Sequence, residues 1–278
     1  MYKRSVGTIP AFLALEKVDC EGPISDHELY LISKHCPKMR NIRLVYNPVV
    51  SRVSESESEL PDLAVLSKIS NLEQLGVMSA DFYSHSLFTV IKTTGGRLTH
   101  LELTNVDELN LASLMMIGDS CKLVTHLNIC CCHYTPESSD RSKLEQACTP
   151  QARTGDRTPF SKLKSATFIV TTSTHIPILK YPIFFALNLE ELKLKQIYQP
   201  LEDSFISSLV CWNPLQSLSQ FSLTNGPHLT LMAANTLIQS CPRLRCIGQV
   251  SSWGRVEREE LLAFKREIVA RNLDIKIQ

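Results

Sequence analysis

The sequence is poor in aromatic residues, in net charge and in long apolar runs, and each deficit argues against a class of function. Aromatic residues make up 7% of the 278 residues, and the formal net charge is +1. Nucleic-acid binding proteins usually carry stacking aromatic side chains on a positively charged surface. No apolar run reaches the roughly 18 residues that cross a bilayer. We therefore expect neither nucleic acid nor a membrane as a partner.

Sequence signatures of catalysis and secretion are also missing. There is no Gly-rich phosphate loop, no paired-carboxylate motif, no H-E-x-x-H motif and no N-x-S/T site. Ten cysteines are unevenly spaced, and the apolar stretch AFLAL near the N-terminus is too short for a signal peptide. We predict a protein of the cytoplasm or nucleus that is not an enzyme and needs no cofactor, with cysteines acting as small buried apolar residues.

What the sequence does contain is an internal repeat. In residues 24–44, ISDHELYLISKHCPKMRNIRL, a helical apolar pattern precedes a strand pattern of the form L-x-x-L-x-L. The gaps between successive strand patterns are 33, 26, 26, 39, 26, 29 and 26 residues, so the basic period is 26. Weaker copies begin at Leu13 and Ala270. The clear copies begin at Met39, Leu72, Leu98, Val124, Leu163, Leu189, Leu218 and Leu244.

Helical patterns separate these strands. Apolar residues recur there at spacings of three and four, which buries one face of a helix. A strand–helix unit of this size cannot bury its apolar face alone, so neighbouring units must stack. We predict an α/β solenoid of about eight or nine repeats, a horseshoe with a parallel sheet on the concave face and helices on the convex face. The stripes are Leu87, Val90, Ile91; Leu111, Leu114, Met115; Phe205, Leu209, Trp212; and Leu231, Ala234, Leu237.

Residues 1–278 are predicted to form this single domain, with loop insertions near 47–60 and 133–160. The first insertion holds alternating serine and glutamate at 54–59, either a solvated acidic loop or a kinase substrate. The second is rich in Pro, Gly, Ser and Thr and is expected to be a loop or partly disordered. A half-polar helix over 256–270 begins the C-terminal cap at 255–278, which closes the stack. Its apolar residues are Leu261, Leu262, Phe264, Ile268 and Val269.

The polar positions of each strand should face away from the helices and form the binding surface. His100 and His126 occupy the same position in consecutive repeats, so they should stack side by side, either as a pH-sensitive pair or as ordinary polar residues. The mixed charges suit a protein or peptide partner bound by a monomer. The predicted protein-binding residues are Arg40, Arg43, Gln74, His100, Glu102, His126, Asn128, Lys164, Glu191, Lys193 and Gln220.

A cluster of cysteine and histidine raises the alternative of a zinc site. Cys121, His126 and His133 surround the run Cys130, Cys131 and Cys132. Neighbouring residues on a strand point to opposite sides, so this run cannot converge on one ion without a turn. No cysteine is marked as an activated nucleophile by a neighbouring base. We therefore predict no metal site and no catalytic residue.

The repeat resembles the leucine-rich repeats of the cysteine-containing, 26-residue subtype. The positions that carry the resemblance are a cysteine three residues before a strand pattern, an I-T-D-like turn, and an Asn or Cys after the strand. Cys20, Asn105 and Asn225 stand one place too early for that last position. The matching residues are Cys36 with Pro37, Cys121, Cys241 with Pro242, then Ile24 to Asp26, and Asn47 and Cys132.

The resemblance implies substrate recognition of F-box/LRR type in a Skp-cullin-F-box ubiquitin ligase, within ubiquitin-dependent protein degradation. The sequence shows no F-box: Leu60, Pro61, Asp62 and Leu63 resemble an F-box opening but fit a repeat helix with proline in its first turn. A Skp-type adaptor is therefore expected only if an F-box lies upstream. The alternatives are a stand-alone adaptor or inhibitor without ligase association, and a cysteine- or metal-dependent enzyme.

Overall fold

The computed structural model describes residues 13–22, 24–45, 62–78, 84–106, 109–132, 139–153, 158–170, 176–196 and 201–278. Within them, ten strands form one parallel sheet in which each strand pairs with the next one along the chain. The strands are β1 (Lys17–Glu21), β2 (Asn41–Val45), β3 (Gln74–Met78), β4 (His100–Thr104), β5 (His126–Cys130), β6 (Ser165–Val170), β7 (Glu191–Gln196), β8 (Gln220–Thr224), β9 (Cys246–Gly248) and β10 (Lys276–Ile277).

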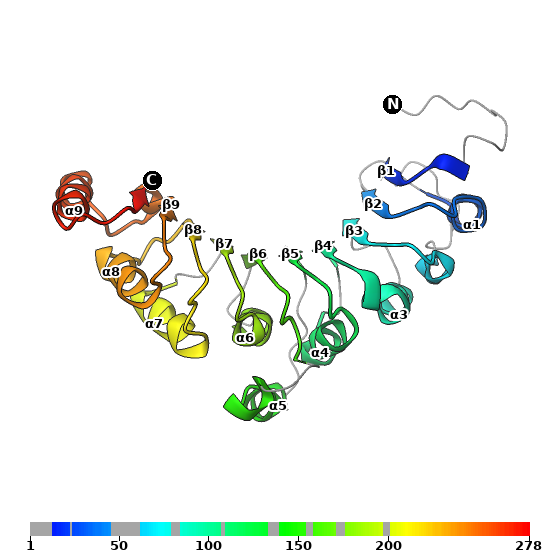
Figure 1. Cartoon of the computed structure of the whole chain (residues 1–278), viewed down its shortest axis with the longest axis horizontal. Helices are drawn as coiled ribbons and strands as arrows, with labels where there is room; N and C mark the ends of the chain where they lie inside the picture. Colours follow the sequence, from blue (N-terminus) through cyan, green and yellow to red (C-terminus); the bar gives the residue numbers. More distant parts are fainter. Residues whose placement is uncertain are drawn as a thin grey trace, which may run out of the picture.

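Helices alternate with the strands and all lie on one side of the sheet, so the molecule is a solenoid-like α/β repeat (Figure 1). The strands follow the inner side of an open arc, and the helices follow its outer side (Figure 1). The helices are α1 (Asp26–His35), α3 (Ser84–Thr94), α4 (Leu111–Ser120), α5 (Asp140–Ala147), α6 (Ile176–Phe185), α7 (Asp203–Trp212), α8 (Leu231–Ser240) and α9 (Arg258–Ala270). Short 3-10 helices are η2 (Leu63–Lys68), η3 (Gly95–Arg97), η4 (Pro150–Arg153) and η6 (Val250–Ser252).

The sheet is buried on its helical side only. Strand residues alternate in direction, and those that face the helices form columns of buried side chains, such as Leu101 beside Leu127 and Leu103 beside Ile129. One continuous apolar core links Val18 of β1 to Ile277 of β10. Each unit therefore shares its core with the next, as the 26-residue period predicted.

A buried column also explains the cysteines that lie three residues before the first apolar residue of a strand pattern. Cys36, Cys121 and Cys241 each end a helix, and their backbone N–H groups donate to the carbonyl four residues earlier. All three side chains are buried. The corresponding positions in other repeats hold the buried residues Ile69, Gly95, Phe160, Ala186 and Leu215. Cysteine therefore occupies a place that demands a small or apolar side chain.

The first and last strands differ from the predicted frames. Val18 pairs with Ile42, so the first frame begins at the half-buried Leu15 rather than at the exposed Leu13. Cys20 is then an inward strand residue beside Leu44 and does not mark the position after the strand. At the other end Ile277 pairs with Ile247, which moves the last frame four residues beyond Ala270.

The two other residues that stood one place early have a backbone explanation. Asn105 and Asn225 follow their strands in the left-handed conformation, with φ of 52° and 63°. Gly22 and Cys131 occupy the same repeat position, and their φ values are 119° and 53°. Asparagine and glycine adopt this conformation more readily than other residues. These four repeats therefore share a left-handed residue after the strand.

The second insertion contains a helix, which corrects the expectation of a loop. α5 covers residues 140–147, although only Leu144 and Asp140 are buried within it. It stands outside the row of helices, so α4 packs directly against α6 (Figure 1). Phe160 closes the insertion at the site opposite Gly118, where a Cβ atom would lie 2.9 Å from the Phe160 ring. Gly118 thus makes room for the aromatic ring between α4 and α6.

The predicted C-terminal cap is fully described, whereas the F-box-like string and several other predicted features are described only in part or not at all. The C-terminal cap is α9 followed by β10, with Leu261, Phe264 and Ile268 buried, whereas Leu262 and Val269 face outward. Asp62 caps η2 and Leu63 is buried, so this part of the F-box-like string belongs to the repeat. Leu60, Pro61, the run 54–59, Asn47 and His133 are outside the described residues.

Candidate functional site

All eleven predicted binding residues lie on the open face of the sheet or just before its strands. Arg40 and Lys164 immediately precede β2 and β6. The other nine fall into two rows that cross the strands in register. We call the first row Asn41, Gln74, His100, His126, Ser165, Glu191 and Gln220, and the second row Arg43, Gly76, Glu102, Asn128, Thr167, Lys193 and Ser222.

A small pit interrupts this face above Gly76. Glycine has no side chain to fill the second row between Arg43 and Glu102, and a Cβ atom there would lie 3.2 Å from Cγ of Arg43. The pit encloses about 160 Å³. Sequence reasoning missed Gly76, although a glycine within a strand often marks a site of close approach. The pit is lined by Lys17, Asn41, Arg43, Gln74, Leu75, Gly76, His100, Leu101, Glu102, His126 and Asn128.

Two of the charged side chains that line the pit, Arg43 and Glu102, lie close enough to form an ion pair. Arg43 lies 3.7 Å from a carboxylate oxygen of Asp19 on one side and 3.7 Å from one of Glu102 on the other. Asn41 Nδ2 donates to Gln74 Oε1 over 2.6 Å. These contacts hold the rim in place without leaving a strong net field. A ligand therefore meets fixed donors and acceptors rather than a single dominant charge.

Two identical threonine–histidine pairs form the central part of the first row. Thr125 Oγ1 donates to the carbonyl of Thr99, and it lies 2.9 Å from His126 Nδ1. Thr99 Oγ1 likewise donates to the carbonyl of Glu73 and lies 2.9 Å from His100 Nδ1. A hydroxyl has one proton, so when it donates to the carbonyl, Nδ1 is the donor toward the hydroxyl oxygen. In that tautomer Nε2 is the acceptor nitrogen of the ring.

The two imidazole rings stack as predicted. Their centroids are 4.1 Å apart and their planes differ by 6°. Partial burial, and then repulsion from His126, lower the pKa of His100 below its ordinary value. At His100 the face is therefore less readily protonated than an isolated imidazole would be.

The next strands carry a second hydrogen-bonded group. Ser165 Oγ donates to Glu191 Oε2 over 2.7 Å, and Lys193 Nζ lies 2.7 Å from Glu191 Oε1. Partial burial alone would raise the pKa of Glu191, but the hydrogen bonds from Lys193 and Ser165 lower it overall. Glu191 is thus a fixed carboxylate. The first row presents two stacked imidazoles in β4 and β5 and a negative charge in β7.

The buried cysteines are chemically unreactive as placed. Burial raises the pKa of Cys121 and of Cys241 to about 12. Burial likewise raises the pKa of Cys130 to about 11 and that of Cys132 to about 12. Thiols with such pKa values stay protonated at neutral pH and are weak nucleophiles and poor metal ligands. In the described ranges, no group of three or more His, Cys, Asp or Glu is arranged to hold a metal ion.

The described helices include none that is both long and apolar enough to cross a bilayer. Comparison with known sequences identifies no relative: no protein-family model matches the chain, and no curated protein matches it significantly.

Proposed function

We propose that the chain is a non-catalytic protein-recognition module of the leucine-rich-repeat type, a horseshoe whose concave sheet binds a partner protein. One observation carries the proposal: a parallel sheet covered by helices on one side only presents two in-register rows of polar side chains on the other. Most of these side chains are half-buried or exposed, so they are accessible to a partner. Polar groups fixed by neighbours lose little entropy on binding.

The dimensions and charges favour a protein over a small molecule. Pockets for drug-sized ligands measure about 300–1,000 Å³, whereas the pit above Gly76 encloses about 160 Å³. That volume suits one side chain of a partner. The rest of the face is broad and mixed in charge, with cations and carboxylates already paired. A partner with its own alternating charges can satisfy such a face, whereas a uniform polyanion cannot.

The resemblance to cysteine-containing leucine-rich repeats extends this proposal. Buried cysteines at the helix ends and a period of 26 residues support it. On this basis the partner is a substrate protein, and the chain is the receptor part of a Skp-cullin-F-box ubiquitin ligase. Contact with a Skp-type adaptor requires an F-box encoded upstream. A stand-alone adaptor or inhibitor uses the same face without the ligase.

Filling the pit tests the binding face. Gly76 has a negative φ, so a side chain there strains no backbone, and Gly76→Gln places atoms between Arg43 and Glu102. The matched control is Gly96→Gln, because nothing lies within 4 Å of a Cβ atom at Gly96. We expect quantitative affinity purification of the full-length product to lose its inner-face partners by about tenfold with Gly76→Gln. The Gly96→Gln protein should retain them, and identical partner sets for both variants would refute the binding face.

Association with a ligase requires a separate test. The full-length product should co-purify with a Skp-type adaptor and a cullin, and removal of an upstream F-box should abolish this without affecting the inner-face partners. If neither adaptor nor cullin co-purifies while the Gly76-sensitive partners remain, the chain is a stand-alone adaptor or inhibitor.

A further inference from the structure

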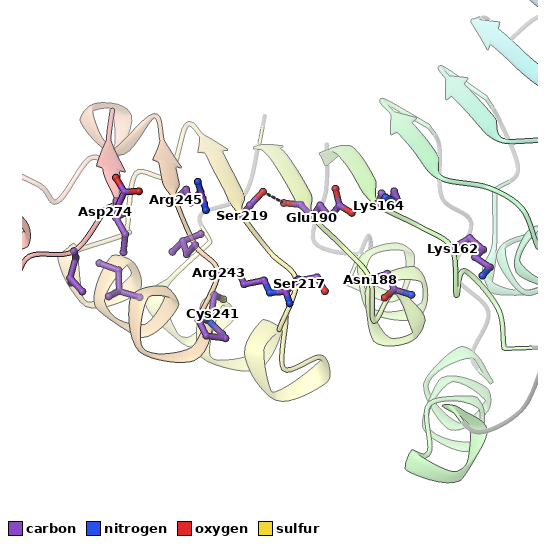
Figure 2. A pocket seen from close by; sticks show the side chains of 15 residues that line it. Lys162, Lys164, Asn188, Glu190, Ser217, Ser219, Cys241, Arg243, Arg245 and Asp274 are labelled. Carbon is purple, nitrogen blue, oxygen red and sulfur yellow. Dashed lines mark hydrogen bonds and ion pairs between the residues drawn. The ribbon is translucent and has the colours of Figure 1, made fainter.

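A groove runs along the edge of the sheet where β6 to β10 begin. It encloses about 920 Å³ and is lined by side chains that precede or open these strands. Figure 2 shows its charged and polar side chains in a row that crosses the strands, from Lys162 and Lys164 at one end to Asp274 at the other. Of the predicted inner-face residues only Lys164 lines it, so the groove is a separate surface.

The charges in this groove are only partly paired. Lys164 Nζ lies 2.9 Å from Glu190 Oε1. Lys162, Arg243 and Arg245 are exposed, and their side chains form no ion pair or hydrogen bond with any residue that the structure describes. Three cations thus stand against one further carboxylate, that of Asp274. At the pit, by contrast, Arg43 is paired with both Asp19 and Glu102.

The two arginines are placed to act together. Arg243 and Arg245 flank the buried Leu244 at the start of β9, and Figure 2 shows Arg243 extending along the groove toward Ser217. A guanidinium group binds a carboxylate through two parallel hydrogen bonds, which makes arginine well suited to acidic side chains.

Apolar side chains line the groove near β10. Ile238 of α8, Leu273 and Ile275 are half-buried there, and each adds exposed apolar surface beside the charged residues. The weaker copy of the strand pattern that begins at Ala270 has Leu273 and Ile275 as its next apolar positions, but the actual strand begins at Lys276. A ligand can therefore gain apolar contact at one end of the groove and charge contact along the remainder.

The spacing of the cations selects an extended ligand. Strands in a sheet are about 4.8 Å apart, so the three intervals from Lys162 before β6 to Arg243 before β9 span about 14 Å. An extended chain advances about 3.4 Å per residue, so two side chains about four residues apart match this span. We propose that the groove binds an extended acidic segment of a partner protein. The segment carries two Asp or Glu residues at that spacing, one bound by Lys162 and the other by Arg243 and Arg245. An apolar residue follows the acidic residue that the arginines bind.

Charge placement favours such a segment over a uniform polyanion. Glu190 and Asp274 also face the groove and would repel a run of phosphates, whereas a peptide can place neutral residues opposite them. The proposal does not depend on the function of the inner face, because the pit lies around β1 to β5 and the groove along β6 to β10.

A designed peptide tests this inference directly. The probe is a fluorescent peptide with glutamate at its second and sixth positions, leucine at its eighth, and glycine and serine elsewhere, together with its reversed sequence. The control probe replaces both glutamates with glutamine. Binding to the full chain is measured by fluorescence anisotropy. The double variant Arg243→Gln with Arg245→Gln should weaken binding by about tenfold or more, whereas Arg266→Gln on an exposed part of α9 should leave it unchanged.

Each outcome decides the question. Binding of a glutamate probe that is lost in the double variant and retained in Arg266→Gln and Gly76→Gln supports the groove and separates it from the inner face. Equal binding of the glutamate and glutamine probes refutes it, as does equal loss in Arg266→Gln, which indicates unspecific attraction. Preferential binding of anionic vesicles or duplex DNA over the peptide would also overturn the proposal. So would self-association of the chain that the double variant abolishes.

Discussion

Among the described residues the connections from helix to strand are not all alike, and two kinds of connection can be compared directly. In the regular kind, Cys121 or Cys241 ends the helix and the strand pattern begins three residues later. In the repeat before β8, α7 ends at Asn213 and Leu215 takes the place of the cysteine in the left-handed conformation, with φ of 48°. This repeat is also longer, with a gap of 29 residues instead of 26.

The longer connection before β8 is held by hydrogen bonds from the side chain of Asn213. Asn213 is buried, and its side chain donates to the carbonyls of Ile183 and Ala186 at 2.7 and 2.9 Å. It also accepts from the backbone N–H of Leu215 at 2.9 Å. A buried backbone turn needs such partners, because unpaired polar groups are costly away from water. The cysteine connection is shorter and satisfies its backbone by the helix itself.

Removing this support should produce the largest effect on stability. Asn213→Ala deletes three hydrogen bonds and leaves the Leu215 N–H without its buried partner, so we expect a loss of about 3 kcal/mol in the free energy of unfolding. Denaturant titration of both variants measures the difference. The control is Asn71→Ala, which removes one exposed hydrogen bond to the carbonyl of Pro37 and should cost less than about 1 kcal/mol. Equal losses in both variants would contradict the contrast between the two connections.

The regular repeats were predictable because their signal is periodic. A strand pattern every 26 residues, each followed by a helical stripe, permits only stacked units with shared burial, and the register places His100 beside His126 as expected. The terminal units depart from the 26-residue spacing, so Leu13 and Ala270 were chosen over the true positions, Leu15 and Asp274. α5 has little apolar pattern beyond Leu144, and its helix could not be inferred.

The candidate sites were predictable only in part. The inner-face residues follow from strand alternation alone. The pit requires knowing that Gly76 lies between Arg43 and Glu102 in space, although they are distant in the sequence. The groove is formed by residues in the turns before the strands, where Arg243 and Lys162 carry no periodic signal. Sequence periodicity identifies faces, whereas cavities depend on which side chains meet across repeats.

A smaller change in stability is expected at Cys131, which follows a strand of a regular repeat. Cys131 is the residue after β5 and has φ of 53°, whereas the equivalent residue after β4 is Asn105. Both donate their backbone N–H to the end of the next strand. Asparagine tolerates this conformation better, so Cys131→Asn should stabilise the chain by about 0.5–1 kcal/mol, measured as a shift of the denaturation midpoint. The reciprocal Asn105→Cys should destabilise it by a similar amount. A loss of stability in Cys131→Asn would show that the cysteine side chain makes a contact that outweighs the backbone strain.

The smallest expected effect concerns the histidine stack that the regular spacing creates. The pKa of His100 is lower in the folded chain than in the unfolded chain, so the unfolded state binds protons more readily. The stability that this site contributes is therefore complete above the unfolded pKa of about 6.5 and falls as the pH drops through that value. Comparison of unfolding at about pH 7.5 and about pH 5.5 should show a larger loss for the wild type than for His100→Asn, which cannot titrate. Because both rings are partly open to solvent, screening keeps the difference small. If the two proteins lose stability equally, folding does not lower the pKa of His100, and neither burial nor the His126 ring 4.1 Å away disfavours its protonation.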